Sequence, residues 1–239
     1  MDKTDSDKFI DLYNQLDAYM RNALKEDRYL DHSRLLREMS TRNSVFLDYL
    51  QYLLTFADIR NMLIHNPYKK DADPLFTLNG YIVKRYAEII DMLLNPPKAI
   101  SIAVPGAAIF TATLDTPALK LMETMTKKNY THVPILKDRS MIGVFSENTL
   151  LSYLVANHEG LILEDAKISD FKDFIKFEDH MNEYFEFVSR NTLLSVVEEI
   201  FHKGMKNKKR IAVVYITHDG KSAEKILGMI TPWDIAMNH

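Results

Sequence analysis

The spacing of apolar residues divides the chain into two parts. Up to about residue 97, apolar side chains recur every three or four positions, which is the period of amphipathic helices. No alternating, strand-like pattern occurs before residue 99. This spacing predicts four helices, over residues 5–27, 32–39, 43–65 and 78–94. We therefore expect residues 1–97 to form an all-helical bundle.

Prolines mark the ends of the third and fourth predicted helices. Asn66-Pro67 should stop the third, because the residue before a proline avoids the helical region. Residues 68–74 follow as a polar turn. Asn95-Pro96-Pro97 should end the fourth helix and begin a short, stiff linker.

From residue 99 the pattern changes to strands and helices that repeat. Residues 99–104 and 109–113 alternate like strands. Further on, residues 141–150 and 226–235 are two versions of one phrase, a short apolar strand that runs into a helix. Before each copy lie a segment with helical periodicity and then a further strand, together covering residues 117–136 and 193–215. The sequence therefore predicts two β-α-β-β-α units in tandem.

The second copy of the phrase carries the clearest binding chemistry. Thr231 is a good N-cap, and Pro232 suits the first helical position, where its missing N–H costs nothing. A helix N-terminus after a strand favours anions, because its free N–H groups point outward. Asp234, one helical turn on, adds a carboxylate suited to ribose hydroxyls. Together these groups predict a nucleotide site.

The first copy matches the second imperfectly. When Gly143 is aligned with Gly228, Ser146 lies over Thr231, but Thr149 takes the place of Asp234. A hydroxyl is a weaker ribose acceptor than a carboxylate, so we expect the second unit to dominate binding. We also expect Trp233 to point away from the ligand, because it lies between the two binding positions.

These residues resemble a tandem pair of CBS domains, the module named after cystathionine β-synthase. The resemblance rests on the closing pattern Gly-x-x-Ser/Thr-x-x-Asp/Asn and on Val133-Pro134-Ile135. It implies a first unit with connector over residues 98–181 and a second over residues 182–239. It also implies a regulatory, adenosine-containing ligand, with AMP, ADP or ATP ahead of a cyclic dinucleotide or S-adenosylmethionine. The binding residues that it implies are Thr231, Asp234, Arg210, Ile211, Ala212, Lys209, Ser146, Thr149, His132 and Pro134.

A second motif, Arg60-Asn-Met-Leu-Ile-His65, closes the third predicted helix. It resembles the signature of the HEPN family (higher eukaryotes and prokaryotes nucleotide-binding), and the likeness covers residues 5–97. The resemblance implies a metal-independent endoribonuclease whose site is shared by two protomers. Arg60 would hold the scissile phosphate and His65 would act as general acid or base, with Asn61 as the third site residue.

Helix geometry limits this interpretation. Residues five apart do not share a helix face, so Arg60 and His65 converge only if the helix ends early or a second subunit supplies one of them. Asn61 and His65, four apart, do share a face. A structural capping network at the helix end is the alternative.

Composition narrows the class of protein. The net charge of −3 argues neither for nor against a nucleic-acid partner. The absence of cysteine excludes disulfides and thiolate metal sites, and the eight histidines show no metal-ligand spacing. The polar N-terminus predicts no signal peptide, and no apolar run approaches a membrane span, so we expect a cytoplasmic protein without a membrane or metal partner.

Two hypotheses follow for the fold expected here, an α+β chain with a helical bundle before a CBS pair. In the first, a homodimeric nucleotide sensor gates a ribonuclease in its helical part. In the second, the protein is a non-catalytic regulator whose helices mediate dimerisation or bind a partner.

Overall fold

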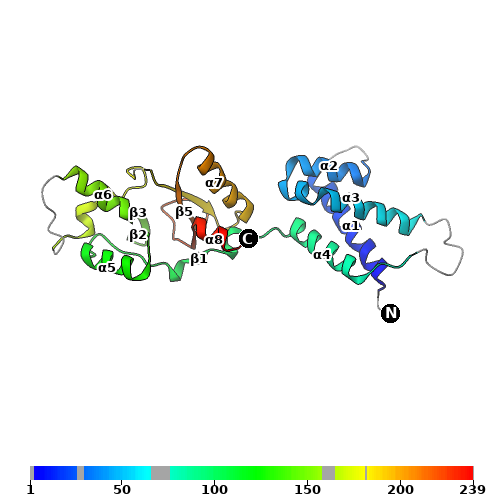
Figure 1. Cartoon of the computed structure of the whole chain (residues 1–239), viewed down its shortest axis with the longest axis horizontal. Coiled ribbons are helices and arrows are strands. Elements are labelled where there is room, and N and C mark those ends of the chain that lie inside the picture. Colours follow the sequence, from blue (N-terminus) through cyan, green and yellow to red (C-terminus); the bar gives the residue numbers. More distant parts are fainter. Residues whose placement is uncertain (1–2, 26–29, 66–75, 158–164, 181, 239) are drawn as a thin grey trace. The chain divides into compact units, whose positions relative to one another are not determined.

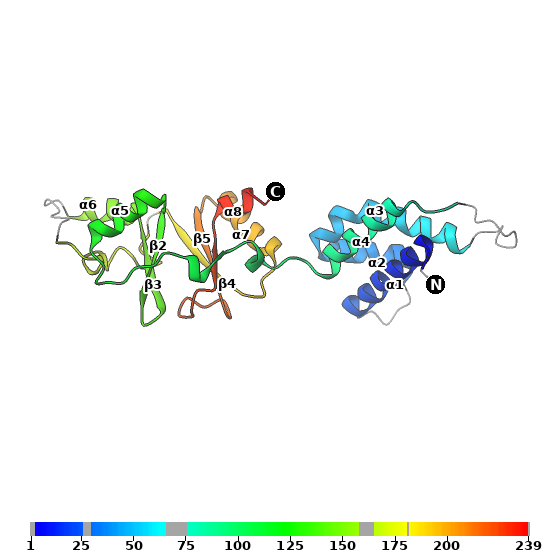
Figure 2. The same cartoon turned by 90° about the horizontal axis from the view of Figure 1, so that it is seen from below.

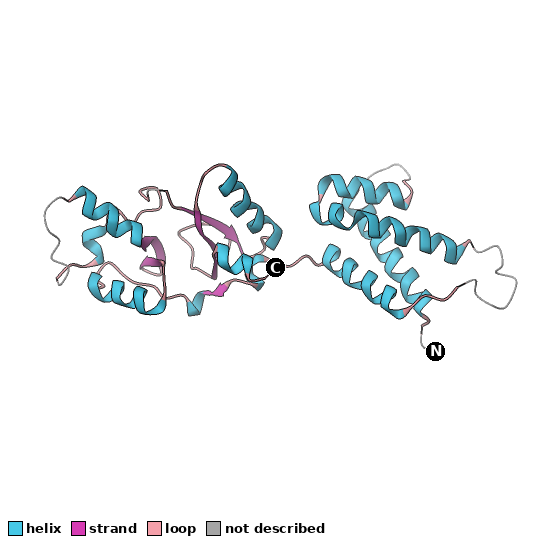
Figure 3. Cartoon of the chain, in the orientation of Figure 1, coloured by secondary structure: helices cyan, strands magenta, loops and turns pink. Residues whose placement is uncertain are grey.

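The computed structural model describes residues 3–25, 30–65, 76–157, 165–180 and 182–238. The chain divides into two units, Met1–Pro96 and Pro97–His239, and each is described by itself. Within the described residues the first unit contains helices alone, whereas the second mixes strands and helices (Figure 3). The predicted α+β fold class is therefore confirmed.

The first unit consists of α1 (Asp5–Leu24), α2 (His32–Arg42), α3 (Ser44–Ile64) and α4 (Gly80–Leu94), drawn in Figures 1 and 2. All four predicted helices are present. Each begins at a polar N-cap whose side chain accepts a backbone N–H from the first turn. The apolar stripes face one another across a core that includes Phe9, Phe56 and Tyr86, whose rings are in contact.

Capping explains where the observed helices depart from the predicted bounds. Asn43 ends α2 and also caps α3, so α2 continues to Arg42 instead of stopping at Met39. Asn79 caps α4, so that helix begins at Gly80 and not at Leu78. The predicted stop at Asn66-Pro67 and the polar turn over residues 68–74 lie outside the described residues.

The second unit begins with the 3₁₀ helix η1 (Ala99–Ser101). The elements that follow are β1 (Val104–Pro105), η2 (Gly106–Ala108), α5 (Ala118–Lys128), β2 (His132–Lys137), β3 (Ser140–Ser146), α6 (Glu147–Ala156), η3 (Ile168–Phe171), β4 (Tyr184–Ser189), α7 (Leu194–Lys206), β5 (Ile211–Thr217), β6 (Gly228–Ile230) and α8 (Pro232–Ala236). The later repeat thus has the predicted order β4-α7-β5-β6-α8.

The predicted strands at residues 99–104 and 109–113 are wrong in large part. Ala99–Ser101 is a 3₁₀ helix, and of the first segment Val104 alone enters a strand. In the second segment, Ala112 makes a single parallel bridge to Ile135. Pro105 lacks a backbone N–H, and the short strand β1 passes into η2 directly after it, so the alternating pattern does not extend into a ladder.

Two sheets result from this arrangement. β1 pairs antiparallel with β6, which gives a four-stranded sheet in the order β1-β6-β5-β4. The β2–β3 hairpin forms a separate two-stranded sheet, which packs with α5 and α6 (Figure 2). One core cluster takes Met141 and Val144 from β3 and Val213 and Tyr215 from β5, so the two repeats share buried apolar surface. In addition, the short strand β1 precedes the first repeat in the chain but belongs to the sheet of the second repeat, because it pairs with β6.

The repeated glycines are packing positions. A Cβ atom at Gly143 would overlap the backbone carbonyl of Ile175, and one at Gly228 would lie 2.9 Å from Cβ of Ala103. The shared glycine of the two phrases is therefore explained by close backbone approach, because no larger residue fits.

We expect Gly143→Ala to destabilise the second unit by about 1–3 kcal/mol, because the new methyl must displace the backbone of Ile175. Urea unfolding of the purified chain measures this loss. Gly80→Ala is the matched control, because its Cβ would meet only the movable carboxylate of Asp5, at 3.2 Å. An unchanged unfolding free energy for Gly143→Ala would contradict this account of the repeat.

Candidate functional site

A pocket of about 250 Å³ lies where the two repeats of the second unit meet. Its walls come from the start of β2, the first turn of α6, the segment before β4, the start of β5 and the first turn of α8. The lining residues are Thr131, His132, Glu147, Asn148, Glu183, Arg210, Ile211, Ala212, Thr231, Pro232 and Trp233. Both repeats therefore contribute to one pocket.

The repeated phrase places a capped helix start at the pocket in each repeat. In α6, Ser146 Oγ accepts from Thr149 N–H at 3.3 Å, and Thr149 Oγ1 accepts from Ser146 N–H at 3.0 Å. In α8, Asp234 Oδ2 accepts from both the N–H and the hydroxyl of Thr231, each at 2.7 Å. The Ser/Thr-x-x-Thr/Asp pattern, which the sequence analysis interpreted as a set of ligand contacts, therefore forms two capping boxes.

Five of the sequence-predicted binding residues line the pocket: His132, Arg210, Ile211, Ala212 and Thr231.

Five others do not line it. Asp234 and Thr149 are engaged in the caps, and Ser146 lines a neighbouring cavity of about 340 Å³. Pro134 is buried within β2, where its carbonyl accepts from Ala112 N–H. The ammonium of Lys209 lies over the Tyr184 ring, 5.1 Å from its centroid. The hydroxyl and carboxylate of the pattern therefore orient the helix starts.

Trp233 is among the residues that line the pocket, together with Pro232, and it is 79% exposed. That Trp233 points away from the ligand stays a prediction, because the lining places the residue beside the pocket and does not place a ligand. An exposed aromatic residue beside a pocket is suited to stacking on a flat ring.

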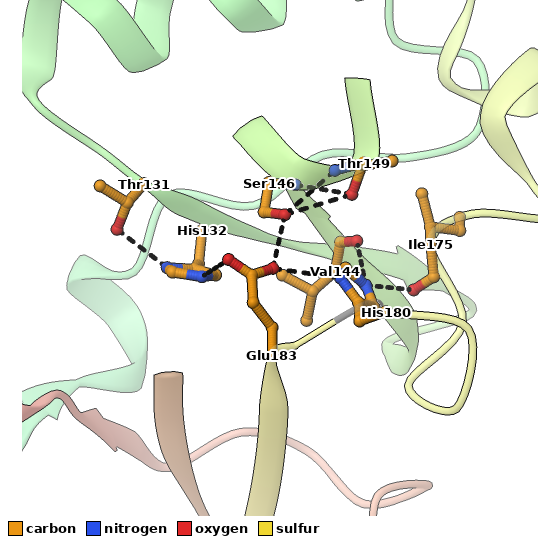
Figure 4. Close-up of polar contacts among 8 residues, drawn as sticks. All are labelled: Thr131, His132, Val144, Ser146, Thr149, Ile175, His180 and Glu183. Atoms are coloured by element: carbon orange, nitrogen blue, oxygen red, sulfur yellow. Dashed lines mark hydrogen bonds and ion pairs between the residues drawn. The ribbon is translucent and has the colours of Figure 1, made fainter. Parts of the chain in front are cut away.

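Glu183 is a pocket residue that the sequence did not indicate. It is 4% exposed and lies just before β4, and Figure 4 shows it surrounded by side chains from distant segments. His132 Nε2 lies 3.2 Å from Oε1, while the Ser146 hydroxyl donates to Oε2 at 2.8 Å and His180 Nδ1 lies 3.3 Å from it. Two of these partners, His132 and Ser146, are 51 and 37 positions from Glu183 in the sequence, so periodicity carries no signal for this site.

The two histidines extend the network on either side. His132 Nδ1 lies 2.8 Å from the Thr131 hydroxyl, at the pocket wall. His180 Nε2 lies 3.0 Å from the Val144 carbonyl and 3.3 Å from that of Ile175. Both nitrogens of His180 thus face acceptors, and the chain of contacts ties the pocket to β3 and the connector (Figure 4).

Electrostatics favour the ionised form of Glu183. Burial by itself would raise the pKa of this carboxyl. Hydrogen bonds from His132, His180 and Ser146 outweigh burial and hold the pKa of Glu183 well below its usual range. The pocket therefore contains a fixed carboxylate whose oxygens are already occupied by protein donors.

We expect Glu183→Gln to lower the unfolding free energy near neutral pH by about 3 kcal/mol, because it breaks a buried charged network. Since the folded pKa of Glu183 lies below the unfolded value, its ionic contribution is complete above about pH 4.3 and is lost on further acidification. The gap between wild type and variant should therefore narrow as pH falls below that value.

Urea unfolding over a pH series measures this gap, with Glu186→Gln, an exposed position on β4, as the control. A gap that is independent of pH would show that the ionic network contributes nothing.

The predicted catalytic residues of the first unit are only partly brought together. Arg60 and Asn61 line a cavity between α1, α2 and α3, and Arg60 Nη1 donates to Asn61 Oδ1 at 3.3 Å. His65 is an exposed C-cap of α3 whose N–H donates to the Asn61 carbonyl, and it is not among the cavity residues. A different histidine, His32, lines that cavity.

The described residues contain no helix that is both long and apolar enough to cross a membrane. Nor do they bring together three or more His, Asp or Glu side chains suited to a metal ion.

Comparison with known protein families gives a match to part of the second unit. The CBS domain family matches residues 102–156, so a CBS domain is present there. No curated protein matches the chain.

Three solved structures illustrate the similarity. CbpB in complex with c-di-AMP shares 14% identity over 65% of this chain and 91% of that chain, with a TM-score of 0.47. CBSX2 in complex with AMP shares 15% identity over 59% and 95%, with a TM-score of 0.42. A hemolysin-like protein containing a CBS domain, from Oenococcus oeni PSU, shares 14% identity over 61% and 92%, with a TM-score of 0.41.

Proposed function

We propose that the second unit is a regulatory sensor that binds an adenosine-containing ligand, AMP, ADP or ATP, in the pocket between its repeats. The observation that carries this proposal is the convergence there of an exposed indole, a guanidinium and the capped start of a helix, from Trp233, Arg210 and Thr231. The CBS domain at residues 102–156 supports it, because that domain supplies the opposite wall.

Each group in the pocket has a role that suits one part of a nucleotide. The indole of Trp233 stacks on the adenine ring. Arg210 forms charge-assisted hydrogen bonds with phosphate oxygens. Glu147 and Asn148 offer acceptors to the ribose hydroxyls from the first turn of α6. Glu183 holds the wall in place, since its oxygens are already bonded to protein donors.

The size of the pocket supports a small ligand. Its volume of about 250 Å³ lies just below the range of roughly 300–1,000 Å³ usual for drug-sized ligands. A mononucleotide with its phosphates at the rim fits this volume better than a cyclic dinucleotide does.

We expect Trp233→Ala and Arg210→Gln each to weaken AMP binding about tenfold, because one loses base stacking and the other a charge-assisted bond. Isothermal calorimetry on the purified chain measures both. Arg190→Gln, an exposed arginine outside the pocket, is the control. The chain has one tryptophan, so AMP should also change the intrinsic fluorescence of Trp233. Unaltered affinity in both variants would place the ligand elsewhere.

For the helical unit we propose the role of effector or dimerisation module, gated by that ligand. The more specific form of this proposal is that the helical unit has ribonuclease activity of the HEPN type. Its support is the shared cavity of Arg60 and Asn61 and the resemblance of the Arg60-to-His65 motif, and the position of His65 outside that cavity weakens it. The alternative is a non-catalytic regulator whose helices bind a partner.

Cleavage of a generic RNA by the purified chain, with no added metal, separates these roles. We expect loss of at least about a hundredfold in rate for Arg60→Ala and His65→Ala if the activity is of this type, since each removes a transition-state contact. Sedimentation at micromolar concentration should show a dimer. A monomer that leaves RNA intact would remove both parts of the proposal for the helical unit.

A further inference from the structure

The helical unit contains a cavity that Arg60 and Asn61 of the predicted nuclease motif share with polar residues of α1 and α2 outside that motif. It lies between α1, α2 and α3 and has a volume of about 440 Å³. Its lining is strongly polar and includes the charged or titratable side chains of Asp17, Arg21, Asp31, His32 and Arg60.

His32 is held in one orientation by contacts from α1. Its side chain is buried, and Nδ1 lies 2.9 Å from Asp17 Oδ1. A carboxylate accepts hydrogen bonds and does not donate them, so the ring donates from Nδ1. The imidazole also stacks on the Tyr13 ring, with centroids 3.8 Å apart and planes at 20°. Asp17 is itself fixed by Arg21 Nε at 2.7 Å.

The second nitrogen of His32 is left unsatisfied. Nε2 is enclosed and has no hydrogen-bond partner among the described residues. Burial lowers the pKa of His32, with the charges of Arg21 and Arg60 acting in the same direction and Asp17 opposing them. The neutral ring, protonated on Nδ1, is therefore favoured, and Nε2 presents a lone pair. A buried acceptor without a donor is costly, which points to a missing partner.

Arg60 is unsatisfied in a complementary way. Its Nε is likewise enclosed without a partner in the described part of the chain, and its guanidinium lies over Tyr13, 5.0 Å from the ring centroid. The rings of Tyr13 and His32 are in contact, so a donor and an acceptor that both lack partners belong to neighbouring side chains of one cavity. Ser33, in the first turn of the eleven-residue helix α2, also lines it.

We propose that this cavity binds a hydrogen phosphate ion, with Arg60 and the N-terminus of α2 holding its charged oxygens and His32 Nε2 accepting its P–OH proton as a hydrogen bond. The ion supplies both groups that the cavity lacks, an anionic acceptor for Arg60 and a hydroxyl donor for His32. No covalent step is involved. Asp17 acts as a positioning residue, because it selects the tautomer that leaves Nε2 as an acceptor.

This arrangement predicts selectivity between two anions of the same shape and charge. Near neutral pH, hydrogen phosphate carries a proton and sulfate does not. Sulfate therefore presents only acceptors to Nε2, and it binds only if His32 first takes up a proton. The charged groups that face His32 are Asp17 and Arg21 from α1, Asp31 from its own segment and Arg60 from α3.

The test is calorimetry of the full chain at about pH 8 with inorganic phosphate and with sodium sulfate. We expect phosphate to bind at least about tenfold more tightly than sulfate. In the sulfate complex, a sulfate oxygen would face the lone pair of His32 Nε2, where phosphate makes a hydrogen bond. Lowering the pH until His32 is protonated should narrow the ratio, because Nε2 of the charged ring donates to sulfate. Equal affinities at pH 8, or no phosphate binding at millimolar concentration, would overturn the proposal and leave an ordered water as the occupant.

Variants locate the site and test the role of Asp17. Arg60→Gln should weaken phosphate binding about tenfold or more, whereas Arg85→Gln on α4 should not. Arg210→Gln should also leave it unchanged, which separates this cavity from the proposed nucleotide pocket. Asp17→Leu removes the acceptor that holds the ring proton on Nδ1, so the tautomer of His32 is no longer fixed and the selectivity for phosphate over sulfate should fall. Selectivity that survives Asp17→Leu unchanged in a folded protein would contradict the role of Asp17 as a positioning residue.

Discussion

The second unit depends on one buried carboxylate. Glu183 lies between the two repeats and accepts hydrogen bonds from a histidine on β2, a histidine of the connector and the serine that caps α6. Each of these donors would be costly to bury alone, and the carboxylate satisfies all three. The network fixes the start of β2 and the first turn of α6 against the segment that leads into β4. Those segments are walls of the pocket, so the shape of the pocket is a consequence of the network.

Both units place a polar cavity at the start of a helix. In the second unit, the capping boxes of α6 and α8 use the Ser/Thr hydroxyls and the Asp234 carboxylate internally. In the proposed nucleotide site, ligand contacts are therefore left to Trp233, Arg210 and the neighbouring first-turn residues. In the helical unit, Asp31 caps α2, and His32 and Ser33 follow it at the cavity. The recurring Ser/Thr/Asp pattern thus builds the sites, and the adjacent residues give them their chemistry.

The sequence predicted features that depend on local periodicity and end signals. The four amphipathic helices and the repeated strand–turn–helix phrase are of this kind, and Thr231 as an N-cap was correctly read. The failure at residues 99–113 has a clear cause. Alternation there was compatible with a strand, but Pro105 and the close packing of Gly106 against Ile226 and Leu227 shorten β1 and leave a bridge at Ala112. Contacts between distant residues left no local trace: Glu183 is 51 positions from His132, and His32 is 15 from Asp17. For the same reason the sequence drew attention to His65, which lies near Arg60 in the chain, whereas His32 is the histidine that shares its cavity.

The central claim is that the pocket between the repeats is a nucleotide site built around Trp233 and Arg210. A crystal structure of the protein grown with AMP tests it most directly. The account predicts an adenine ring stacked on the indole of Trp233, a phosphate within hydrogen-bond distance of Arg210, and Glu183 still bonded to Ser146. AMP bound at another place, with this pocket unchanged and empty, would contradict it.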